Sequence, residues 1–271
     1  MPPMIPTFLY GTAWKEDETE RLVRLAIDAG FRGIDTANQR RHYFEAAVGA
    51  AIQASGVSRD QLFLQTKFTY LDSQDDRLPY DPDADVATQV RQSFASSLEH
   101  LQVDAIDSYV LHGPSRRHGL SQDDLDVWGV MEELHDAQKT RYLGVSNVAL
   151  DQLEMLVAHA RVKPMFVQNR CFARSGWDHH VRRFCRAHGI VYQGFSLLTA
   201  NVTELRTRAF REIVQRTGRT PAQVVFRFAQ QIGMLPLTGT TDREHMAEDL
   251  ASETFELSAD DLQRMETIAV A

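Results

Sequence analysis

The sequence has 271 residues but only two cysteines, Cys171 and Cys185, and neither belongs to a Cys-x-x-Cys pair. Two isolated cysteines cannot build the disulfide framework of a small secreted domain, and they lack the spacing of a zinc site. We therefore expect no resident metal. The lack of a disulfide framework also favours a reducing compartment, of which the cytoplasm is the default.

Long apolar runs and excess positive charge are missing as well. No apolar run approaches the roughly 18 residues that a membrane-spanning helix needs. The first residues, MPPMIPTFLYG, lack the basic segment and apolar core of a signal peptide. The formal net charge is −8, which argues against binding to nucleic acid or to an anionic membrane. The partner expected of such a chain is a small molecule.

Eight short apolar runs, rich in β-branched and aromatic residues, predict strands. They cover residues 7–11, 31–37, 62–68, 105–112, 141–147, 165–170, 189–196 and 234–240. Between them lie amphipathic stretches with helical spacing, among them 17–30, 86–101, 220–233 and 258–269. This alternation predicts an α/β fold, a (β/α)8 TIM barrel that forms a single domain over residues 1–271.

An open, doubly wound sheet is the alternative fold. It is less favoured, because the strand count is eight and no Gly-x-Gly-x-x-Gly motif follows a strand. The long polar segment at 69–85 follows the third predicted strand and contains two prolines. Its length and composition indicate a functional loop rather than a linker.

Polar or aromatic side chains stand where the predicted strands end, which in a (β/α)8 barrel is where active sites lie. They are Asp35, Lys67, His112, Ser146, Asn147, Gln168, Asn169, Phe195 and Ser196. Taken singly, each is more typical of a turn, a helix cap or a solvated side chain. Together they converge on one opening, where Lys67 supplies the cation that a buried Asp35 requires.

Tyr43 lies in the polar segment that follows Asp35. A phenol of ordinary pKa is a poor acid at neutral pH, and a nearby ammonium such as that of Lys67 is expected to lower its pKa. His112 is suited to donate a hydrogen bond to a substrate carbonyl. These groups predict a proton donor for an oxygen that gains charge when hydride reaches its carbon.

The chain resembles the aldo-keto reductases. The motifs that carry the resemblance occur in the family's order along nearly the whole chain: GFRGIDTA, YFEAAVGAAI, LFLQTK, IDSYVLHGP, YLGVSN, VQNR, GFSLL and TPAQVVFRFA. The resemblance implies a (β/α)8 barrel that reduces aldehydes and ketones with NADPH. It maps the family's catalytic tetrad onto Asp35, Tyr43, Lys67 and His112.

The same resemblance implies a cofactor site and a substrate pocket. Ser146, Asn147 and Gln168 match the family's contacts to the nicotinamide carboxamide, and Phe195 stands where an aromatic residue stacks on the ring. Ser196 and Leu198 match positions that contact the pyrophosphate. The expected substrate pocket includes Trp14, His42 and Tyr70.

The tyrosine segment departs from the family pattern. Counted back from Val48, His42 occupies the usual position of the tyrosine, and Tyr43 falls one residue later. We favour Tyr43 as the acid, with His42 as the alternative. The segment and the long loop resemble a subgroup that acts on α-keto amides and related carbonyls.

The expected cofactor contacts also depart from the family. Leu237 stands where a lysine often contacts the 2′-phosphate, and Met246 replaces an acidic residue that contacts adenine. Thr238, Thr241, Arg243 and a following helix N-terminus could still hold a phosphate. The sequence therefore predicts NADPH, with NADH possible.

Three further expectations concern substrate charge, assembly and competing functions. Arg116 and Arg117 could favour an anionic substrate, although a solvated loop is the better interpretation.

The family resemblance implies a monomer, with a dimer possible. One competing function is a cofactor-sensing protein without turnover. The other is a Schiff-base lyase that uses Lys67.

Overall fold

The computed structural model describes residues 5–269 and shows a closed barrel of eight parallel strands. The strands are β1 Leu9–Gly11, β2 Gly33–Asp35, β3 Phe63–Phe68, β4 Ile106–Leu111, β5 Thr140–Ser146, β6 Phe166–Arg170, β7 Val191–Phe195 and β8 Met234–Thr238. They pair in chain order, and β8 closes the barrel against β1. The predicted fold is confirmed, and each strand lies within or overlaps its predicted range.

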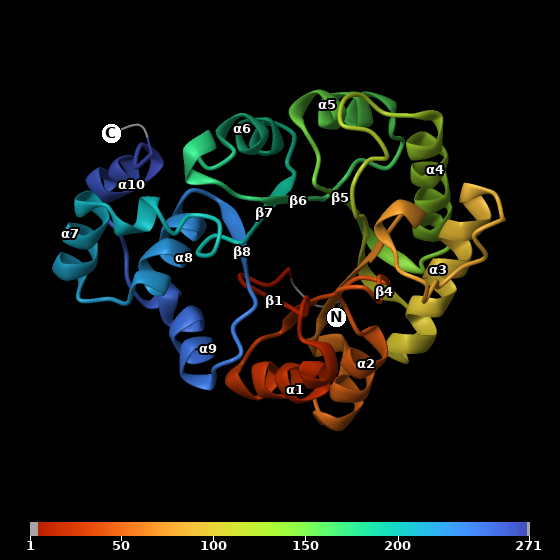
Figure 1. Cartoon of the computed structure of the whole chain (residues 1–271), viewed down its shortest axis with the longest axis horizontal. Helices are drawn as coiled ribbons and strands as arrows, with labels where there is room; N and C mark the ends of the chain where they lie inside the picture. The colour runs from red at the N-terminus through yellow and green to blue at the C-terminus, as the bar shows by residue number, and fades with distance from the viewer. Residues whose placement is uncertain (1–4, 270–271) are drawn as a thin grey trace.

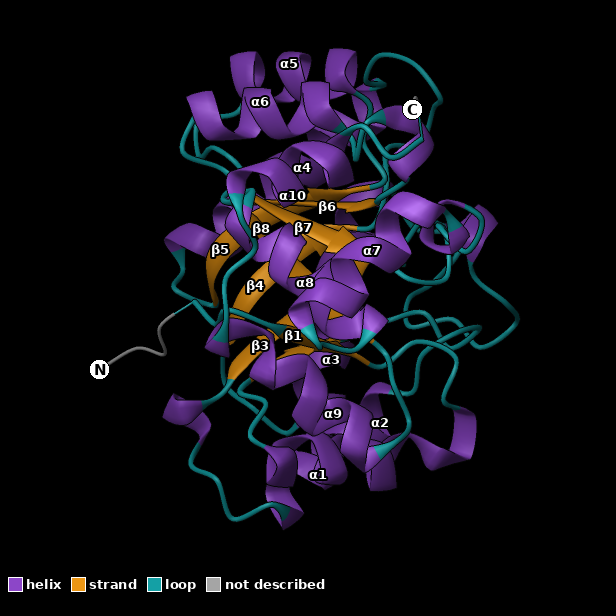
Figure 2. Cartoon of the chain, turned by 90° about the vertical axis from the view of Figure 1, so that its left-hand side faces the viewer, coloured by secondary structure: helices purple, strands orange, loops and turns teal. Residues whose placement is uncertain are grey.

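Helices surround the barrel, as Figures 1 and 2 show. They are α1 Thr19–Ala29, α2 Glu45–Ala54, α3 Val86–Leu101, α4 Gln122–Asp136, α5 Leu150–His159, α6 His179–Ala187, α7 Arg208–Thr217, α8 Pro221–Gln231, α9 Arg243–Leu250 and α10 Ala259–Glu266. The four predicted helices correspond to α1, α3, α8 and α10. None of the helices in residues 5–269 is long and apolar enough to cross a membrane.

Local sequence signals explain where the predicted helices begin. In α8, Thr220 accepts from the backbone of Gln223, whose side chain bonds back to Thr220, and Pro221 occupies the first turn. In α10, Ser258 and Asp261 form the same reciprocal pair. These caps satisfy amide groups that a helix start leaves without partners.

The side chains inside the barrel change from apolar to polar along its axis. At the amino-terminal end of the strands, four apolar side chains pack together: Leu9, Phe63, Phe166 and Leu235. Above them, Gln65 of β3 and Gln193 of β7 exchange two amide hydrogen bonds, at 2.8 and 3.0 Å. The interior positions of β3 therefore run from Phe63 through Gln65 to Lys67, because alternate residues of a strand face the same side.

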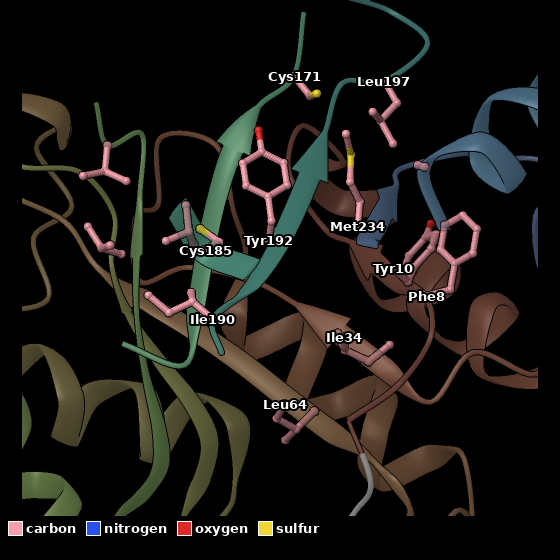
Figure 3. Packing of buried hydrophobic residues seen from close by; sticks show 14 of the residues in the cluster. Phe8, Tyr10, Ile34, Leu64, Cys171, Cys185, Ile190, Tyr192, Leu197 and Met234 are labelled. Carbon is pink, nitrogen blue, oxygen red and sulfur yellow. The ribbon is translucent and has the colours of Figure 1, made fainter. Parts of the chain in front are cut away.

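The main apolar core lies between the barrel and the helices. Figure 3 shows part of it, with Tyr192 and Met234 on neighbouring strands and Ile34 and Leu64 on the opposite side of the barrel. Cys171 and Cys185 belong to this core and are not bonded to each other. Burial raises the pKa of each thiol to about 12, so neither is a reactive thiolate.

Two helix glycines make a matched test of this packing. A Cβ on Gly49 in α2 would overlap the backbone carbonyl of His100, whereas a Cβ on Gly129 in α4 would meet nothing within 4 Å. We expect Gly49→Ala to lower the free energy of unfolding by about 1–3 kcal/mol, because α2 and α3 must separate. Gly129→Ala should raise it by about 0.5–1 kcal/mol, since alanine favours the helix.

Urea denaturation followed by circular dichroism measures both variants against the wild type. Equal midpoints for Gly49→Ala and the wild type would show that the α2–α3 contact tolerates the extra methyl group.

Candidate active site

Asp35 and Lys67 form an ion pair at the carboxyl end of the barrel. The Lys67 Nζ lies 2.7 and 2.8 Å from the two carboxylate oxygens and donates a third hydrogen bond to the backbone oxygen of Thr36 at 2.8 Å. The Lys67 side chain is 0% exposed and that of Asp35 is 4% exposed. Burial lowers the pKa of Lys67, and the Asp35 carboxylate opposes this shift.

The structure brings Tyr43, and not His42, to this pair. The Lys67 Nζ lies 5.3 Å from the centre of the Tyr43 ring, and the His112 ring centre lies 5.9 Å from it. His42 instead stacks on Trp14, with ring centres 3.9 Å apart. The extra residue in the segment therefore turns the imidazole toward Trp14 and the phenol toward Lys67.

The expected effect of Lys67 on Tyr43 needs correction. The structure raises the pKa of Tyr43, through burial first and the Asp35 charge second. These two effects outweigh the nearby Lys67 ammonium, whose own charge is paired with Asp35. Tyr43 is consequently held in its protonated form, as an acid and not as a phenolate.

His112 follows β4 and lies beside the tyrosine. Burial and the nearby Lys67 ammonium lower the pKa of His112 to about 3, so the imidazole is neutral at physiological pH. Its Nδ1 lies 2.7 Å from the hydroxyl oxygen of Thr69. Thr69 was not singled out from the sequence, since a threonine two residues after Lys67 carries no recognisable signal by itself.

Amide side chains from β5 and β6 complete the polar surface beside the pair. Gln168 donates to Asp35 at 3.0 Å and to Gln193 at 2.9 Å, and Ser146 donates to the backbone oxygen of Gln168 at 2.7 Å. Asn147 donates to the backbone oxygen of His112 at 2.8 Å. Among the described residues, the side-chain oxygens of Gln168 and Asn147 accept no hydrogen bond, so both can receive an N–H of a bound carboxamide.

Asn169, the other β6 residue that the sequence singled out, has a structural role. Its side chain bonds to the backbone of Val148 in both directions and to Asp178. It therefore ties the segment after β5 to the segment after β6.

Two cavities meet at Tyr43 and His112. The first, here the β8-side cavity, has about 910 Å³ and extends toward β8 and α9. Most of the predicted cofactor residues line it: Ser146, Asn147, Gln168, Phe195, Ser196, Leu198, Thr238 and Thr241. Asn147 and Ser196 both adopt left-handed backbone conformations, at φ 51° and 56°, and such strain is typical of ligand sites.

The α9 end of this cavity differs from expectation. Arg243 is exposed and is not among the lining residues, and Met246 is buried in the core. The amides of Glu244 and His245 in the first turn of α9 bond to the Asp242 carboxylate, at 2.8 and 3.1 Å. The expectation that this helix N-terminus holds a phosphate therefore gains no support from these contacts and stays a prediction.

Residues that the sequence did not indicate line the α9 end instead. They are His245, Glu248 and Asp249, two of which lie one turn apart on α9, which begins at Arg243 directly after the segment TGTTD as expected. Burial raises the pKa of Asp249 to about 7, and Thr238 donates to its carboxyl group at 2.8 Å. Lys15 lines the same cavity and donates to the backbone oxygen of Gly239 at 2.8 Å.

The second cavity, here the β3-side cavity, has about 930 Å³ and lies between the 69–85 loop and α4. The predicted substrate-pocket residues Trp14, His42 and Tyr70 all line it. Arg116 and Arg117 are exposed and are not among its lining residues. The solvated-loop interpretation of these arginines therefore agrees with the structure.

Sequence comparison places this chain among known enzymes. The sequence model described as the aldo/keto reductase family matches residues 7–270. Glyoxal reductase of Bacillus subtilis is 29% identical over 252 residues, which cover 93% of this chain and 84% of that protein. An aldo-keto reductase of Mycolicibacterium vanbaalenii is 31% identical over 249 residues, covering 92% and 82%.

Comparison of structures gives the same result. The crystal structure of an aldo/keto reductase from Brucella melitensis matches this chain with a TM-score of 0.83 and 25% sequence identity. The match covers 97% of this chain and 95% of the other.

The contact between His112 and Thr69 allows a test of the imidazole state. Within the described residues the Thr69 hydroxyl has no other acceptor, so it donates to Nδ1 and leaves the ring proton on Nε2. We expect ¹⁵N NMR to show a neutral, Nε2-protonated His112 from pH 5 to pH 8, since its pKa of about 3 lies below this range.

Thr69→Val should mix the two tautomers, and Thr69→Ser should preserve the wild-type state. A wild-type His112 that titrates near pH 6.5, or that carries its proton on Nδ1, would contradict this assignment.

Proposed function

Because the chain belongs to the aldo/keto reductase family, and is an oxidoreductase that reduces carbonyl groups, we propose that Tyr43, His112, Lys67 and Asp35 form its catalytic group. One observation carries this proposal. The four side chains come from separate segments and meet where the two cavities join, with Tyr43 and His112 lining both cavities. A carbonyl bound at this junction would contact the phenol and the imidazole.

Each residue would have a separate task. A bound nicotinamide supplies the hydride that reduces the carbonyl carbon. Tyr43 keeps its proton until the carbonyl oxygen gains charge, and then donates it to that oxygen. His112 donates from Nε2 to the same oxygen and orients it. Lys67 and Asp35 fix the floor of the site and hold its net charge near zero.

The competing functions have less support. The relatives with assigned activities are named reductases, which does not favour a cofactor sensor without turnover. A Schiff base at Lys67 requires a neutral amine with a free lone pair. Here the Lys67 nitrogen donates three hydrogen bonds, two of them to a carboxylate.

The β8-side cavity fits a nicotinamide cofactor. The free side-chain oxygens of Asn147 and Gln168 match the amide N–H groups of the carboxamide, and the half-buried ring of Phe195 offers a flat apolar face. Lys15 is the one lysine or arginine among the lining residues of the described chain, and it would face the cofactor phosphates. These contacts support the use of either NADPH or NADH.

The choice between the two cofactors depends on the α9 end of the cavity. Lys15 and the threonine hydroxyls favour the 2′-phosphate of NADPH, as the sequence predicts. Glu248 and Asp249 favour the free 2′-hydroxyl of NADH, because a carboxylate accepts from a hydroxyl and repels a phosphate. We therefore propose NADPH as the cofactor, with weak selectivity over NADH.

The sequence-based expectations of a monomer and of a cytoplasmic location remain proposals. Size-exclusion chromatography with light scattering tests the first of them.

Replacing Tyr43 with phenylalanine tests the acid. We expect Tyr43→Phe to lower kcat for aldehyde reduction by about 10²–10⁴-fold, which is the range of general acid catalysis. Cofactor affinity, followed by quenching of protein fluorescence, should stay unchanged. His42→Ala serves as the control and should retain most of the turnover. If His42→Ala is inactive and Tyr43→Phe is active, the general acid is His42 and not Tyr43.

Leu237 tests the cofactor proposal. Leu237→Lys places an ammonium among the residues that line the β8-side cavity. We expect the ratio of kcat/KM for NADPH to that for NADH to rise about tenfold, equivalent to about 1.4 kcal/mol. Leu237→Met, which adds no charge, should leave the ratio unchanged. An equal ratio in both variants would show that the 2′-phosphate lies elsewhere.

A further inference from the structure

The β3-side cavity contains a set of carboxylates that the proposed chemistry does not use. Asp72 lies in the turn after β3, Asp85 precedes α3, and Asp123 and Asp126 lie on α4. The 69–85 loop and α4 thus bring four exposed carboxylates to one cavity. Among the residues that the structure describes, none of the four aspartates forms an ion pair, and no lysine or arginine lines this cavity.

Tyr70, which forms the cavity wall between the β3 loop and α4, is affected by several of the nearby carboxylates. The Tyr70 hydroxyl donates to Asp124 at 2.8 Å and so joins the β3 loop to α4. Burial raises the pKa of Tyr70 strongly, and the charges of Asp124, Asp123 and Asp126 raise it further. The negative potential therefore extends into the cavity wall and is not confined to the solvated rim.

Two further side chains, Gln39 and Trp14, line the cavity beside these carboxylates. Gln39 is 4% exposed and donates to the backbone oxygen of Ser73 at 2.7 Å. Its carbonyl oxygen has no donor within the described chain, and an acceptor left in that state is costly. Trp14 is 71% exposed, with its indole stacked on His42. The Gln39 oxygen is itself buried, so the exposed indole of Trp14 is the group that a ligand cation would contact here, through a cation–π interaction.

We propose that the β3-side cavity selects carbonyl substrates that carry a cationic group, such as an ammonium, at the end distant from the carbonyl. The carbonyl would lie at Tyr43 and His112, and the cation would lie among the aspartates and the Trp14 ring. This assignment rests on the proposed function, because it takes the junction of the cavities as the reaction centre. It reverses the sign of the substrate charge that Arg116 and Arg117 had suggested.

Three aldehydes of similar size test the proposal: 4-(trimethylammoniomethyl)benzaldehyde, its neutral isostere 4-(2,2-dimethylpropyl)benzaldehyde, and 4-(carboxymethyl)benzaldehyde. The methylene group separates the charge from the ring, so the three carbonyls have similar reactivity. At about 10 mM ionic strength we expect kcat/KM for the cationic aldehyde to exceed that for the neutral one by about tenfold or more. The anionic aldehyde should be the poorest of the three. At about 0.5 M salt the difference should largely disappear.

The triple variant Asp72→Asn/Asp123→Asn/Asp126→Asn tests the residues themselves. Asp85 is left in place, because its side chain caps α3 through the backbone of Thr88. The variant should lose most of the preference for the cation, measured as the ratio of kcat/KM for the cationic aldehyde to that for the neutral one. The control carries the same change in net charge at the other end of the barrel, at Asp28, Asp60 and Asp104, and should keep the wild-type ratio.

The outcomes separate the two proposals. Equal kcat/KM for the cationic and neutral aldehydes in the wild type, or an unchanged ratio in the triple variant, would overturn the charge selectivity while leaving the reductase intact. If none of the three aldehydes is reduced with NADPH or NADH, the proposed catalytic group itself fails. A further outcome is that the ratio of kcat/KM for the cationic aldehyde to that for the neutral one falls as far in the control as in the triple variant. That result would overturn the proposal, because the preference would then depend on net charge and not on the aspartates of this cavity.

Discussion

Two opposite charges, those of Asp35 and Lys67, lie almost out of contact with water at the carboxyl end of the barrel. Removing either charge alone would leave the other buried and unpaired, at a cost of about 3–5 kcal/mol. The pair is satisfied completely, since Lys67 donates three hydrogen bonds and Asp35 also accepts from Gln65 and Gln168. The strands that carry these groups must therefore keep their register, because a slip of one residue would turn the side chains out of the barrel.

The polar layer beneath the pair follows from the same constraint. A carboxylate only accepts, so Gln65 must turn its NH₂ group toward Asp35 and its oxygen toward Ser108. That orientation determines how Gln193 faces Gln65, and in turn how Gln168 faces Gln193. One buried charge thus orders amides on three strands, and it leaves the oxygen of Gln168 available beside the β8-side cavity.

Strand ends and helix caps were predictable from the sequence because each depends on a short local pattern. The convergence of Asp35, Lys67 and His112 followed from the barrel topology alone. Whether His42 or Tyr43 faces Lys67 was harder to predict, because their side-chain directions depend on how the loop packs against Trp14. The α9 end could not be inferred, because the start of a helix does not tell which of its faces packs on the core, and here Met246 is buried while Glu248 lines the cavity. The carboxylates of the β3-side cavity come from the 69–85 loop and from α4, and only the folded chain brings them together.

The raised pKa of Tyr43 is compatible with acid catalysis, because the carbonyl oxygen that accepts the proton becomes a much stronger base during the reaction. A neutral carbonyl oxygen is a weak base and takes no proton from a phenol. An oxygen that has just become an alkoxide is a stronger base than a phenolate, so the proton moves downhill at that moment. A free ammonium beside the phenol would weaken this timing by stabilising a phenolate beforehand, and the Asp35 carboxylate offsets the charge of Lys67. Burial and this carboxylate therefore keep the acid protonated until the substrate requires the proton.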